Sequence, residues 1–158
     1  MLKAVFPGSF DPPTLGHINI IERVCALFSE VVVVIAENTQ KKYLFSAEER
    51  QSMMQELVKP RGNVRCLIWD SLIVDFMKRE NAQILIRGLR GMDDFSYEFE
   101  LSMMNKVLAP QIETFFIPTD PRYIVLRSSS IKELASYNGD ISPMVPPLVM
   151  DALKKKLN

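Results

Sequence analysis

Apolar residues fall into short runs that alternate with longer segments of helical period. Val31 to Ala36 is apolar at every position, as expected of a central parallel strand covered on both faces. From Gly16 to Phe28 the apolar residues recur at three- and four-residue spacing, which predicts a helix. Along the whole chain these patterns predict strands at 2–6, 31–36, 64–69, 84–86 and 112–117, and helices at 16–28, 46–58, 70–78, 95–108, 130–138 and 146–156.

Local signals mark the boundaries of several elements. Ser46 and Glu49 have the spacing of a capping box, in which each side chain satisfies a free amide at the start of a helix. Ser130 and Glu133 have the same spacing and predict a second capping box. We expect the Pro-Gly pair at residues 7–8 to end the first strand and the Arg-Gly pair at 87–88 to end the fourth.

Five strands alternating with helices predict an α/β fold: a Rossmann-like, doubly wound five-stranded parallel sheet with helices on both faces. No repeat or linker interrupts the pattern, so residues 1–158 are expected to form one domain. Ligands of such sheets bind beyond the carboxyl ends of the strands, near the switch point. The chemistry is therefore expected in the loops after the strands, at 7–16, 37–43, 69–72, 87–91 and 118–129.

The composition narrows the class of protein. Basic and acidic residues number 19 each, so the basic excess that is typical of nucleic-acid binders is missing. Cys25 and Cys66 each lie in an apolar run, which favours buried free thiols over a disulfide or a metal site. The longest apolar run is too short to span a bilayer, and no signal peptide is visible. We expect a cytoplasmic protein without a membrane partner.

The segment 7–17 is the richest in candidate chemistry. Prolines and glycines constrain its backbone, while Ser9, Thr14 and His17 supply polar side chains. His17 lies at the start of the first predicted helix, where free amides and the helix dipole favour an anion. The histidine could donate a hydrogen bond to a phosphate when neutral, or add charge when protonated. The alternative is that His17 only caps the helix or simply lies exposed.

Several common phosphate and hydrolase motifs are missing from the sequence. There is no Gly-x-x-x-x-Gly-Lys-Ser/Thr, and no Gly-x-Gly-x-x-Gly follows the first strand, so kinase-type phosphate loops and dinucleotide dehydrogenases are poorly supported. No Gly-x-Ser-x-Gly elbow supports a serine hydrolase. No carboxylate cluster suggests a metal site made by the protein.

Two motifs carry a family resemblance. Thr14-Leu-Gly-His17 resembles the Thr/His-x-Gly-His signature of the nucleotidyltransferase superfamily, and the serines at 128–130 resemble its second signature, a serine-rich turn before a helix. With Arg87-Gly-Leu-Arg90, Asp94-Phe-Ser-Tyr-Glu98 and Asn105, the chain resembles the bacterial phosphopantetheine adenylyltransferases along essentially its full length.

This resemblance implies an activity and its partners. The enzyme would transfer the adenylyl group of ATP to 4'-phosphopantetheine, giving dephospho-coenzyme A and pyrophosphate in coenzyme A biosynthesis. Mg²⁺ would take part as a chelate of ATP, held largely by water and substrate oxygens. The resemblance also implies a homohexamer.

The resemblance further implies roles for individual residues. His17 would contact the α-phosphate and stabilise the transition state, with Lys41 and Arg90 as the other catalytic residues. No side chain is expected to ligate a metal. The ATP site would comprise Ser9, Phe10, His17, Gly88, Leu89, Arg90, Glu98, Ile124, Val125, Leu126, Arg127, Ser128, Ser129 and Ser130, and the acceptor site Ser9, Lys41, Leu72, Ile73, Arg87 and Asn105.

The sequence departs from the family pattern at three places. Arg127 precedes the three serines where the family usually has an apolar residue, and Leu15 replaces a residue that is commonly polar. An apparent insertion of one residue around 120–123 shifts the adenine loop. Without the resemblance, Lys41 fits equally well a solvated loop, and Glu98 an exposed helix carboxylate.

Two other functions stay open on the sequence alone. A related nucleotidyltransferase could use nicotinamide mononucleotide or glycerol phosphate as acceptor, although Lys41, Arg87 and the apolar pair at 72–73 suit a phosphate on a long pantetheine arm. A non-catalytic nucleotide-binding regulator would be expected to lack His17 or Lys41, and both are present.

The predicted helix 95–108 carries a cluster of large apolar residues. Leu101, Met103 and Met104 are expected to pack in the core, as methionines commonly do. Because the resembled family is hexameric, part of this surface could instead bury a subunit contact.

Overall fold

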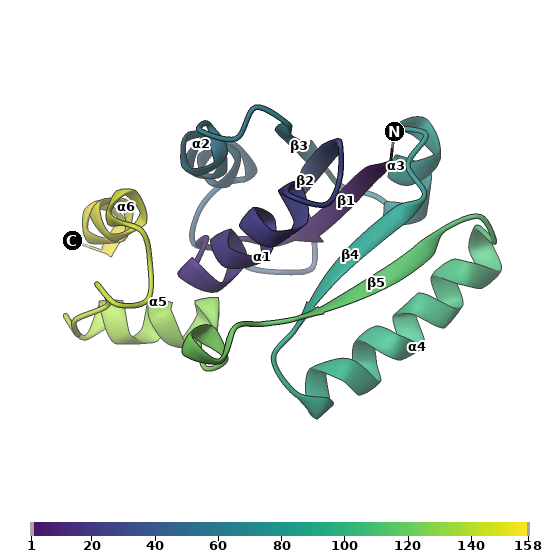
Figure 1. The fold of residues 1–158 in the computed structure, drawn as a ribbon. Coiled ribbons are helices and arrows are strands. Elements are labelled where there is room, and N and C mark those ends of the chain that lie inside the picture. The colour runs from purple at the N-terminus through teal and green to yellow at the C-terminus, as the bar shows by residue number, and fades with distance from the viewer. Residues whose placement is uncertain (1, 158) are drawn as a thin grey trace.

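A computed structural model describes residues 2–157 as one parallel sheet whose strands alternate with helices along the chain (Figure 1). The strands are β1 (Lys3–Gly8), β2 (Glu30–Ala36), β3 (Val64–Trp69), β4 (Ile84–Leu89) and β5 (Glu113–Pro118). The helices are α1 (Leu15–Cys25), α2 (Ala47–Val58), α3 (Ile73–Arg79), α4 (Met92–Leu108), α5 (Ser128–Ser136) and α6 (Pro147–Leu157), with a short 3₁₀ turn η1 (Pro121–Tyr123).

The sheet has the strand order β3-β2-β1-β4-β5. The chain adds β2 and β3 on one side of β1, then crosses back and adds β4 and β5 on the other side, with all neighbouring strands parallel. The carboxyl ends of β1 and β4 therefore lie where the winding reverses, which is the topological switch point of this kind of sheet. The predicted α/β, doubly wound, five-stranded parallel sheet is confirmed.

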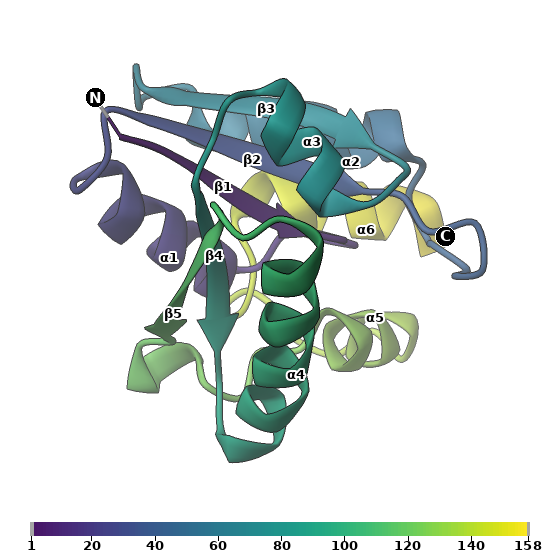
Figure 2. The same cartoon turned by 90° about the vertical axis from the view of Figure 1, so that its right-hand side faces the viewer.

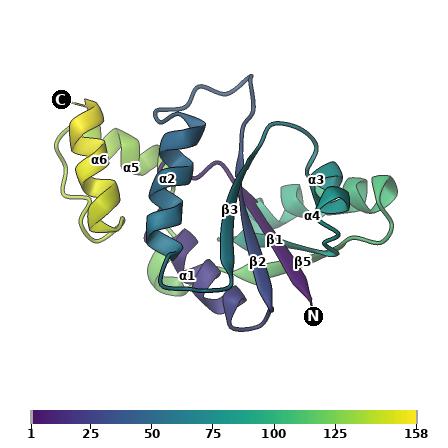
Figure 3. The same cartoon turned by 90° about the horizontal axis from the view of Figure 1, so that it is seen from above.

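Helices cover both faces of the sheet, with α1 and α2 on one face and α3 and α4 on the other (Figure 3). The apolar run of β2 explains how both faces are filled, since successive strand residues point to opposite faces. Val31, Val33 and Ile35 pack in the core under α1 and α2, whereas Val32 and Val34 pack in the core under α3. An all-apolar strand thus supplies two cores at once.

The last two helices form a third apolar cluster beside the sheet. Ile131 of α5 and Val149 and Leu153 of α6 pack with Phe45 and with Met53 of α2. Figure 3 shows α5 and α6 beside α2 at one edge of the molecule. This packing brings the start of α5 close to the carboxyl ends of the strands.

Two strands run further than predicted. β1 continues through Pro7 and Gly8, which pair with β2, and β4 continues to Leu89, in register with β5. Pro7 is tolerated because β1 and β4 pair only at Ala4 and Val5, so at Pro7 the strand has a single hydrogen-bonded neighbour. The predicted strand ends at the Pro-Gly and Arg-Gly pairs are therefore wrong.

One predicted helix cap is confirmed and the other is wrong. Ser46 accepts a bond from the Glu49 amide (3.2 Å), and the Glu49 carboxylate accepts one from the Ser46 amide (2.7 Å). Ser130 does not cap α5, because that helix begins at Ser128 with Arg127 in the capping position. The early start follows from a tertiary bond, since the Ser128 hydroxyl donates to the Pro12 carbonyl (2.9 Å).

Helix α4 is the least buried element of the sheet layers. In Figure 2 its outer side faces the viewer with no other element in front of it. Met103 and Met104 are each about half exposed, so the prediction that they pack in the core of this chain is wrong, while Leu101 is half-buried. The physical reason is that α4 packs on β4 and on the edge strand β5, and within residues 2–157 no other element covers its outer side.

Two further findings bear on the class of protein. Cys66 is buried and Cys25 is half-buried, and both are free thiols. Burial raises the pKa of the Cys66 thiol to about 12. Between residues 2 and 157, no helix has the length and apolar character needed to cross a membrane.

Candidate active site

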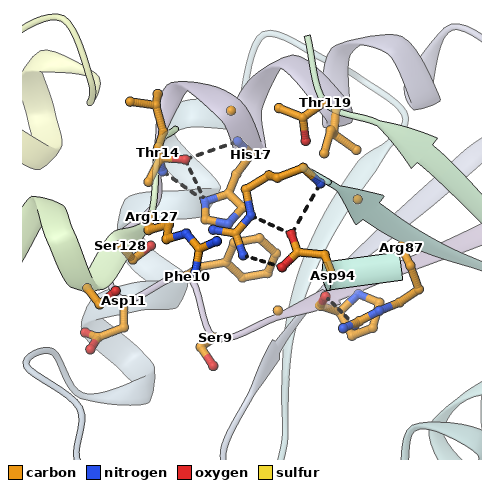
Figure 4. Close-up of a pocket in the computed structure, with 18 of the residues that line it drawn as sticks. Ser9, Phe10, Asp11, Thr14, His17, Arg87, Asp94, Thr119, Arg127 and Ser128 are labelled. Carbon is orange, nitrogen blue, oxygen red and sulfur yellow. Dashed lines mark hydrogen bonds and ion pairs between the residues drawn. The ribbon is translucent and has the colours of Figure 1, made fainter. Parts of the chain in front are cut away.

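A pocket of about 740 Å³ opens at the carboxyl ends of β1 and β4 (Figure 4). The two strands pair only at Ala4–Val5 with Ile84–Leu85, and the segments beyond this pairing line the pocket. Its volume falls in the range of roughly 300–1,000 Å³ that is typical of small-molecule and cofactor sites. The switch point predicted to hold the ligand thus coincides with a real cavity.

Most of the predicted site residues line this pocket. They come from the carboxyl end of β4, from the loops after β1, β2, β4 and β5, and from the helices α1, α4 and α5. The predicted residues in the lining are Ser9, Phe10, His17, Lys41, Arg87, Gly88, Arg90, Glu98, Leu126, Arg127, Ser128 and Ser129.

The other predicted residues lie outside the lining. Leu72 and Ile73 follow β3, an edge strand separated from β1 by β2, and Asn105 lies near the far end of α4. Ile124 and Val125 are exposed beyond η1, while Leu89 and Ser130 adjoin residues that line the pocket. The binding roles expected of these residues stay predictions.

The loop after β1 is locked by an aromatic contact. Phe10 is buried, has a φ of 47°, and packs its ring edge-to-face on the His17 ring, with centroids 4.9 Å apart. A Cβ at Gly8 would lie 2.8 Å from the Phe10 ring, so only glycine fits there. The left-handed Phe10 backbone and the missing side chain at Gly8 together place the histidine ring.

The capping contacts of α1 determine which nitrogen of His17 faces the pocket. The Thr14 amide donates to His17 Nδ1 (3.0 Å), and the His17 amide donates to the Thr14 hydroxyl (3.3 Å). Because Nδ1 accepts an N–H, the proton of the neutral ring lies on Nε2. The helix cap and a phosphate contact, which the sequence presented as alternatives, use different atoms of the same ring.

The surroundings of His17 also set its charge. Removal from water, and then the positive charge of Arg90, lower the pKa of His17 to about 4. The ring is therefore neutral at neutral pH, and it offers the pocket a hydrogen-bond donor without a positive charge. Of the two phosphate-binding modes considered from the sequence, the neutral donor is the one that this geometry favours.

Two arginines, Arg87 at the end of β4 and Arg90 just after it, are held by carboxylates of α4. Arg87 donates from Nε and Nη2 to the two oxygens of Glu98 (2.6 and 2.5 Å), and Arg90 donates likewise to Asp94 (2.8 and 3.2 Å). The hydrogen bond and charge of Arg90 lower the pKa of Asp94. The anionic partner that Arg87 needs at the end of a buried strand is thus Glu98, a residue predicted to bind the nucleotide. Each guanidinium has five N–H donors, so donors remain for a bound anion.

Other basic groups face the pocket without a carboxylate partner. Within residues 2–157, Lys41, Lys42 and Arg127 line the cavity and make no ion pair. Ser128 and Ser129 lie at the start of α5, where free backbone amides favour an anion. Together with neutral His17, this arrangement suits a ligand that carries several phosphates.

Four lining or supporting residues were given no role from the sequence, although Asp94 was named as part of a family motif. A pairing role for Asp94 could have been inferred from its four-residue spacing to Arg90, which lies just before α4. Arg50 could have been suspected, because it shares a helical face with Met53 and Met54, which are buried. Asp11 and Lys132, which pair at 2.7 Å across the chain, give no such local signal.

The described chain shows no ready-made metal centre. Between residues 2 and 157, no three or more histidine, cysteine, aspartate or glutamate side chains gather as a metal site would require. The carboxylates that line the pocket are Asp11, Asp93, Asp94 and Glu98, and all but Asp93 are paired with a basic side chain.

Comparison with protein families places most of this chain in a known family. Residues 5–134 match the family described as cytidylyltransferase-like. The matched range runs from within β1 through β5 and includes the whole first loop and most of α5.

Curated relatives match over nearly the full chain. Phosphopantetheine adenylyltransferase of Dictyoglomus thermophilum is 47% identical over 99% of this chain and 95% of its own length. The protein of the same name from Clostridium tetani is 48% identical over 98% and 97%, and that from Clostridium botulinum strain Hall is 43% identical over 100% and 96%.

Two solved structures share the fold. Nicotinic acid mononucleotide adenylyltransferase of Plasmodium falciparum, complexed with NaAD, superposes with a TM-score of 0.70 at 17% identity, over 97% of this chain and 94% of that chain. A candidate nicotinate-nucleotide adenylyltransferase from Vibrio parahaemolyticus gives a TM-score of 0.70 at 19% identity, over 99% and 95%. At these identities the likeness extends to the fold alone.

Proposed function

Since this chain belongs to the cytidylyltransferase-like family, and within it to the phosphopantetheine adenylyltransferases, we propose that it transfers the adenylyl group of ATP to 4'-phosphopantetheine. The products are dephospho-coenzyme A and pyrophosphate, and the reaction belongs to coenzyme A biosynthesis. The observation that carries the proposal is a neutral His17, with Nε2–H as its free donor, in a pocket lined by Lys41, Arg87 and Arg90.

The reaction needs positioning and charge neutralisation more than covalent chemistry. A phosphate oxygen of 4'-phosphopantetheine attacks the α-phosphorus of ATP, and the bond from that phosphorus to the bridging oxygen breaks, so that pyrophosphate leaves with the electron pair. Both oxygens must lie in line with phosphorus while negative charge spreads over the oxygens around it. A pocket whose hydrogen-bond donors are held in place serves both needs.

His17 is the donor that we assign to the α-phosphate. Its Nε2–H can bond a non-bridging α-oxygen, and this bond strengthens as charge builds there in the transition state. Nδ1 accepts the Thr14 amide and α1 is anchored in the core, so the ring need not reorganise during the reaction. Loss of one such donor typically costs about 3–4 kcal/mol of transition-state stabilisation.

Charged and backbone donors complete the proposed site. Lys41 and Arg90 would neutralise the phosphates around the reaction centre, and Arg87 would hold the acceptor phosphate. Free amides at the start of α5 would bind the β- and γ-phosphates, since helix amino ends favour anions. For ATP, we assign the adenine to residues 124–127 and further nucleotide contacts to Gly88, Leu89 and Glu98. The remaining phosphate contacts are assigned to Ser9, Phe10, Ser128, Ser129 and Ser130. The pantetheine arm is assigned to Leu72, Ile73 and Asn105.

We propose Mg²⁺ as a chelate of the ATP triphosphate. The donor set supports this form of binding: the pocket carboxylates Asp94 and Glu98 hold arginines, and no three-ligand cluster occurs within residues 2–157. An ion held mainly by phosphate oxygens and water needs no dedicated protein cage. When bound, it supplies charge neutralisation at the leaving pyrophosphate.

The proposal extends to a homohexamer acting in the cytoplasm, where ATP is available. The assembly is supported by the outer side of α4, where seven large apolar residues are exposed, since apolar residues gathered on one surface mark an interaction site. These residues are Met92, Tyr97, Phe99, Met103, Met104, Val107 and Leu108.

Pyrophosphate release from ATP tests the proposed function. Wild type is offered 4'-phosphopantetheine, nicotinamide mononucleotide and glycerol phosphate in turn, and 4'-phosphopantetheine is expected to give by far the highest kcat/KM. His17→Ala is expected to lower kcat by roughly a hundredfold to a thousandfold. Lys59→Ala, at an exposed lysine just after α2, is the matched surface control. Preference for another acceptor would overturn the substrate assignment, and full turnover by His17→Ala would overturn the role of the histidine.

A further inference from the structure

Asp11 is a buried carboxylate to which the proposed chemistry assigns no task. It follows Phe10 in the loop after β1 and is 4% exposed. Its Oδ2 accepts the Leu44 amide and its Oδ1 accepts the Phe45 amide, each at 3.0 Å. Those amides end the segment 37–46, which connects β2 to α2 and carries Lys41.

A second buried charge holds the same segment from its other side. Arg50 of α2 is fully buried; its Nε donates to the Phe45 carbonyl (3.2 Å), and its Nη1 donates to the carbonyls of Ser9 (2.8 Å) and Ala36 (3.2 Å). Phe45 is thus bonded at its N–H by Asp11 and at its carbonyl by Arg50. Both ends of the segment 37–46 are thereby fixed to the loop after β1, and Lys41 lies between these fixed ends.

The charge of Asp11 needs an explanation, because a carboxylate beside a polyphosphate site repels the ligand. Lys132 of α5 places its ammonium 2.7 Å from Oδ2 and offsets that charge. In Figure 4 the Asp11 carboxylate points away from His17. With three donors on its two oxygens, Asp11 is poorly placed to act as a base and well placed to hold backbone.

We propose that Asp11 is a positioning residue that fixes the segment 37–46, so that Lys41 meets the reacting phosphates in a defined place. The inference rests on the proposed adenylyl transfer and on the role given there to Lys41. It adds that catalysis depends on a long-range bond between two loops that follow neighbouring strands, β1 and β2.

A double-mutant cycle tests this inference, with kcat measured by pyrophosphate release from ATP and 4'-phosphopantetheine. Asp11→Asn replaces one accepting oxygen by an amide group, so one of the two backbone bonds is lost. Because small misplacements of a catalytic group are costly, kcat should fall by about tenfold to a hundredfold in the wild-type background. In the Lys41→Ala background the same change should alter kcat by less than about twofold, since coupled sites are not additive. Equal losses in both backgrounds would overturn the inference.

Two further variants serve as a matched control and as a substitute for Asp11→Asn. Asp140→Asn makes the same chemical change at an exposed aspartate that accepts the Ser142 amide away from the pocket, and it should leave kcat unchanged. Asp11→Glu takes the place of Asp11→Asn if that variant does not fold. It keeps the charge but shifts the carboxylate by one methylene, so its effect on kcat should depend on Lys41 in the same way.

Hydrogen exchange supplies a readout independent of activity. The amides of Leu44 and Phe45 should exchange faster in Asp11→Asn than in wild type, while the amides of β2 stay protected. Unchanged exchange at both amides would refute the positioning role. If wild type itself releases no pyrophosphate with any acceptor, the proposed function fails; if wild type is active and the cycle is additive, the inference about Asp11 fails alone.

Discussion

Helices α1 and α4 both serve the pocket, but they are held in opposite ways. α1 has eleven residues and buries four of them, Gly16, Ile20, Ile21 and Val24. α4 has seventeen residues, of which Ser102 alone is buried in the described chain. The first carries His17 on a core-anchored backbone, whereas the second contributes Asp94 and Glu98 through ion pairs with arginines at and just after the end of β4.

The difference suggests that the two sides of the pocket differ in rigidity. We call α1 with His17 the fixed wall, and Arg87 and Arg90 with their partners Glu98 and Asp94 the adjustable wall. The position of His17 is set by packing and by capping bonds that need no ligand. The arginines at 87 and 90 are set by carboxylates, which a phosphate can replace because it offers the same kind of acceptor. A nucleotidyltransferase profits from both, since the transition state needs a fixed donor while substrates must enter and leave.

The largest effect on the free energy of unfolding is expected from a substitution in the core under the fixed wall. Ile21→Ala removes a fully buried side chain of α1 and should lower the free energy of unfolding by about 3–4 kcal/mol, through lost burial and the cavity left behind. Met103→Ala, on exposed α4, should cost less than about 1 kcal/mol. Urea unfolding followed by circular dichroism, at dilutions where sedimentation shows single chains, measures both. Equal losses would remove the distinction between the walls.

The pH dependence of stability tests whether the fixed wall holds His17 neutral. The pKa of His17 is about 4 in the folded chain against an ordinary value of 6.5, so the unfolded chain binds a proton first as pH falls. The stability contributed by the neutral ring is complete above pH 6.5 and is lost between about pH 6.5 and pH 4, amounting to roughly 2–3 kcal/mol.

A variant without this titration isolates the effect. His17→Gln should unfold with a shallower loss of stability across that window, because both proteins share every other titrating group. Urea midpoints at a series of pH values give the two curves. Parallel curves would show that the histidine is not held neutral.

A smaller effect is expected at the adjustable wall. Asp94→Asn removes the charge that competes for Arg90, so inorganic pyrophosphate should bind roughly fivefold more tightly, as expected of a partly exposed ion pair of about 1 kcal/mol. Asp75→Asn is the control, at an exposed aspartate paired with Lys78 on α3. Isothermal titration calorimetry measures both affinities. Weaker binding by Asp94→Asn would mean that the carboxylate organises the arginine for its ligand.

The smallest effect on the folded chain is expected on the outer side of α4. Val107→Glu places a charge at a residue that is 82% exposed, so the circular dichroism spectrum should not change and the single chain should unfold as before, within about 0.5 kcal/mol. The assembly should nevertheless fall to smaller species in sedimentation, since the charge is buried at the proposed contact. An unchanged mass would remove α4 from the proposed subunit interface.

The fold was predictable because its signals are local. The apolar run of β2 and the capping box at Ser46 are readable within a few residues, and the structure confirms both. The extra length of β1 through Pro7 was not readable, because it depends on which neighbour the strand pairs with at that point. The exposure of Met103 was not readable either, since burial depends on what covers a helix.

The same division holds for the site. His17 stands out from its own loop, and the structure places it in the pocket. Asp11 and Arg50 form hydrogen bonds with residues 34 and 41 positions away in the chain, and no local sequence pattern predicts such bonds. Leu72 follows an edge strand and lies outside the lining, a consequence of strand order that the linear sequence does not contain.

Nuclear magnetic resonance of His17 tests the central claim most directly, because it is the only histidine in the sequence and its ring gives a single set of signals. Nitrogen shifts report both the pKa and the tautomer. We predict a pKa of about 4, with the proton on Nε2 from about pH 5 to about pH 8. A pKa at or above 6.5, or a proton on Nδ1, would contradict the assignment of His17 as a fixed neutral donor to the α-phosphate.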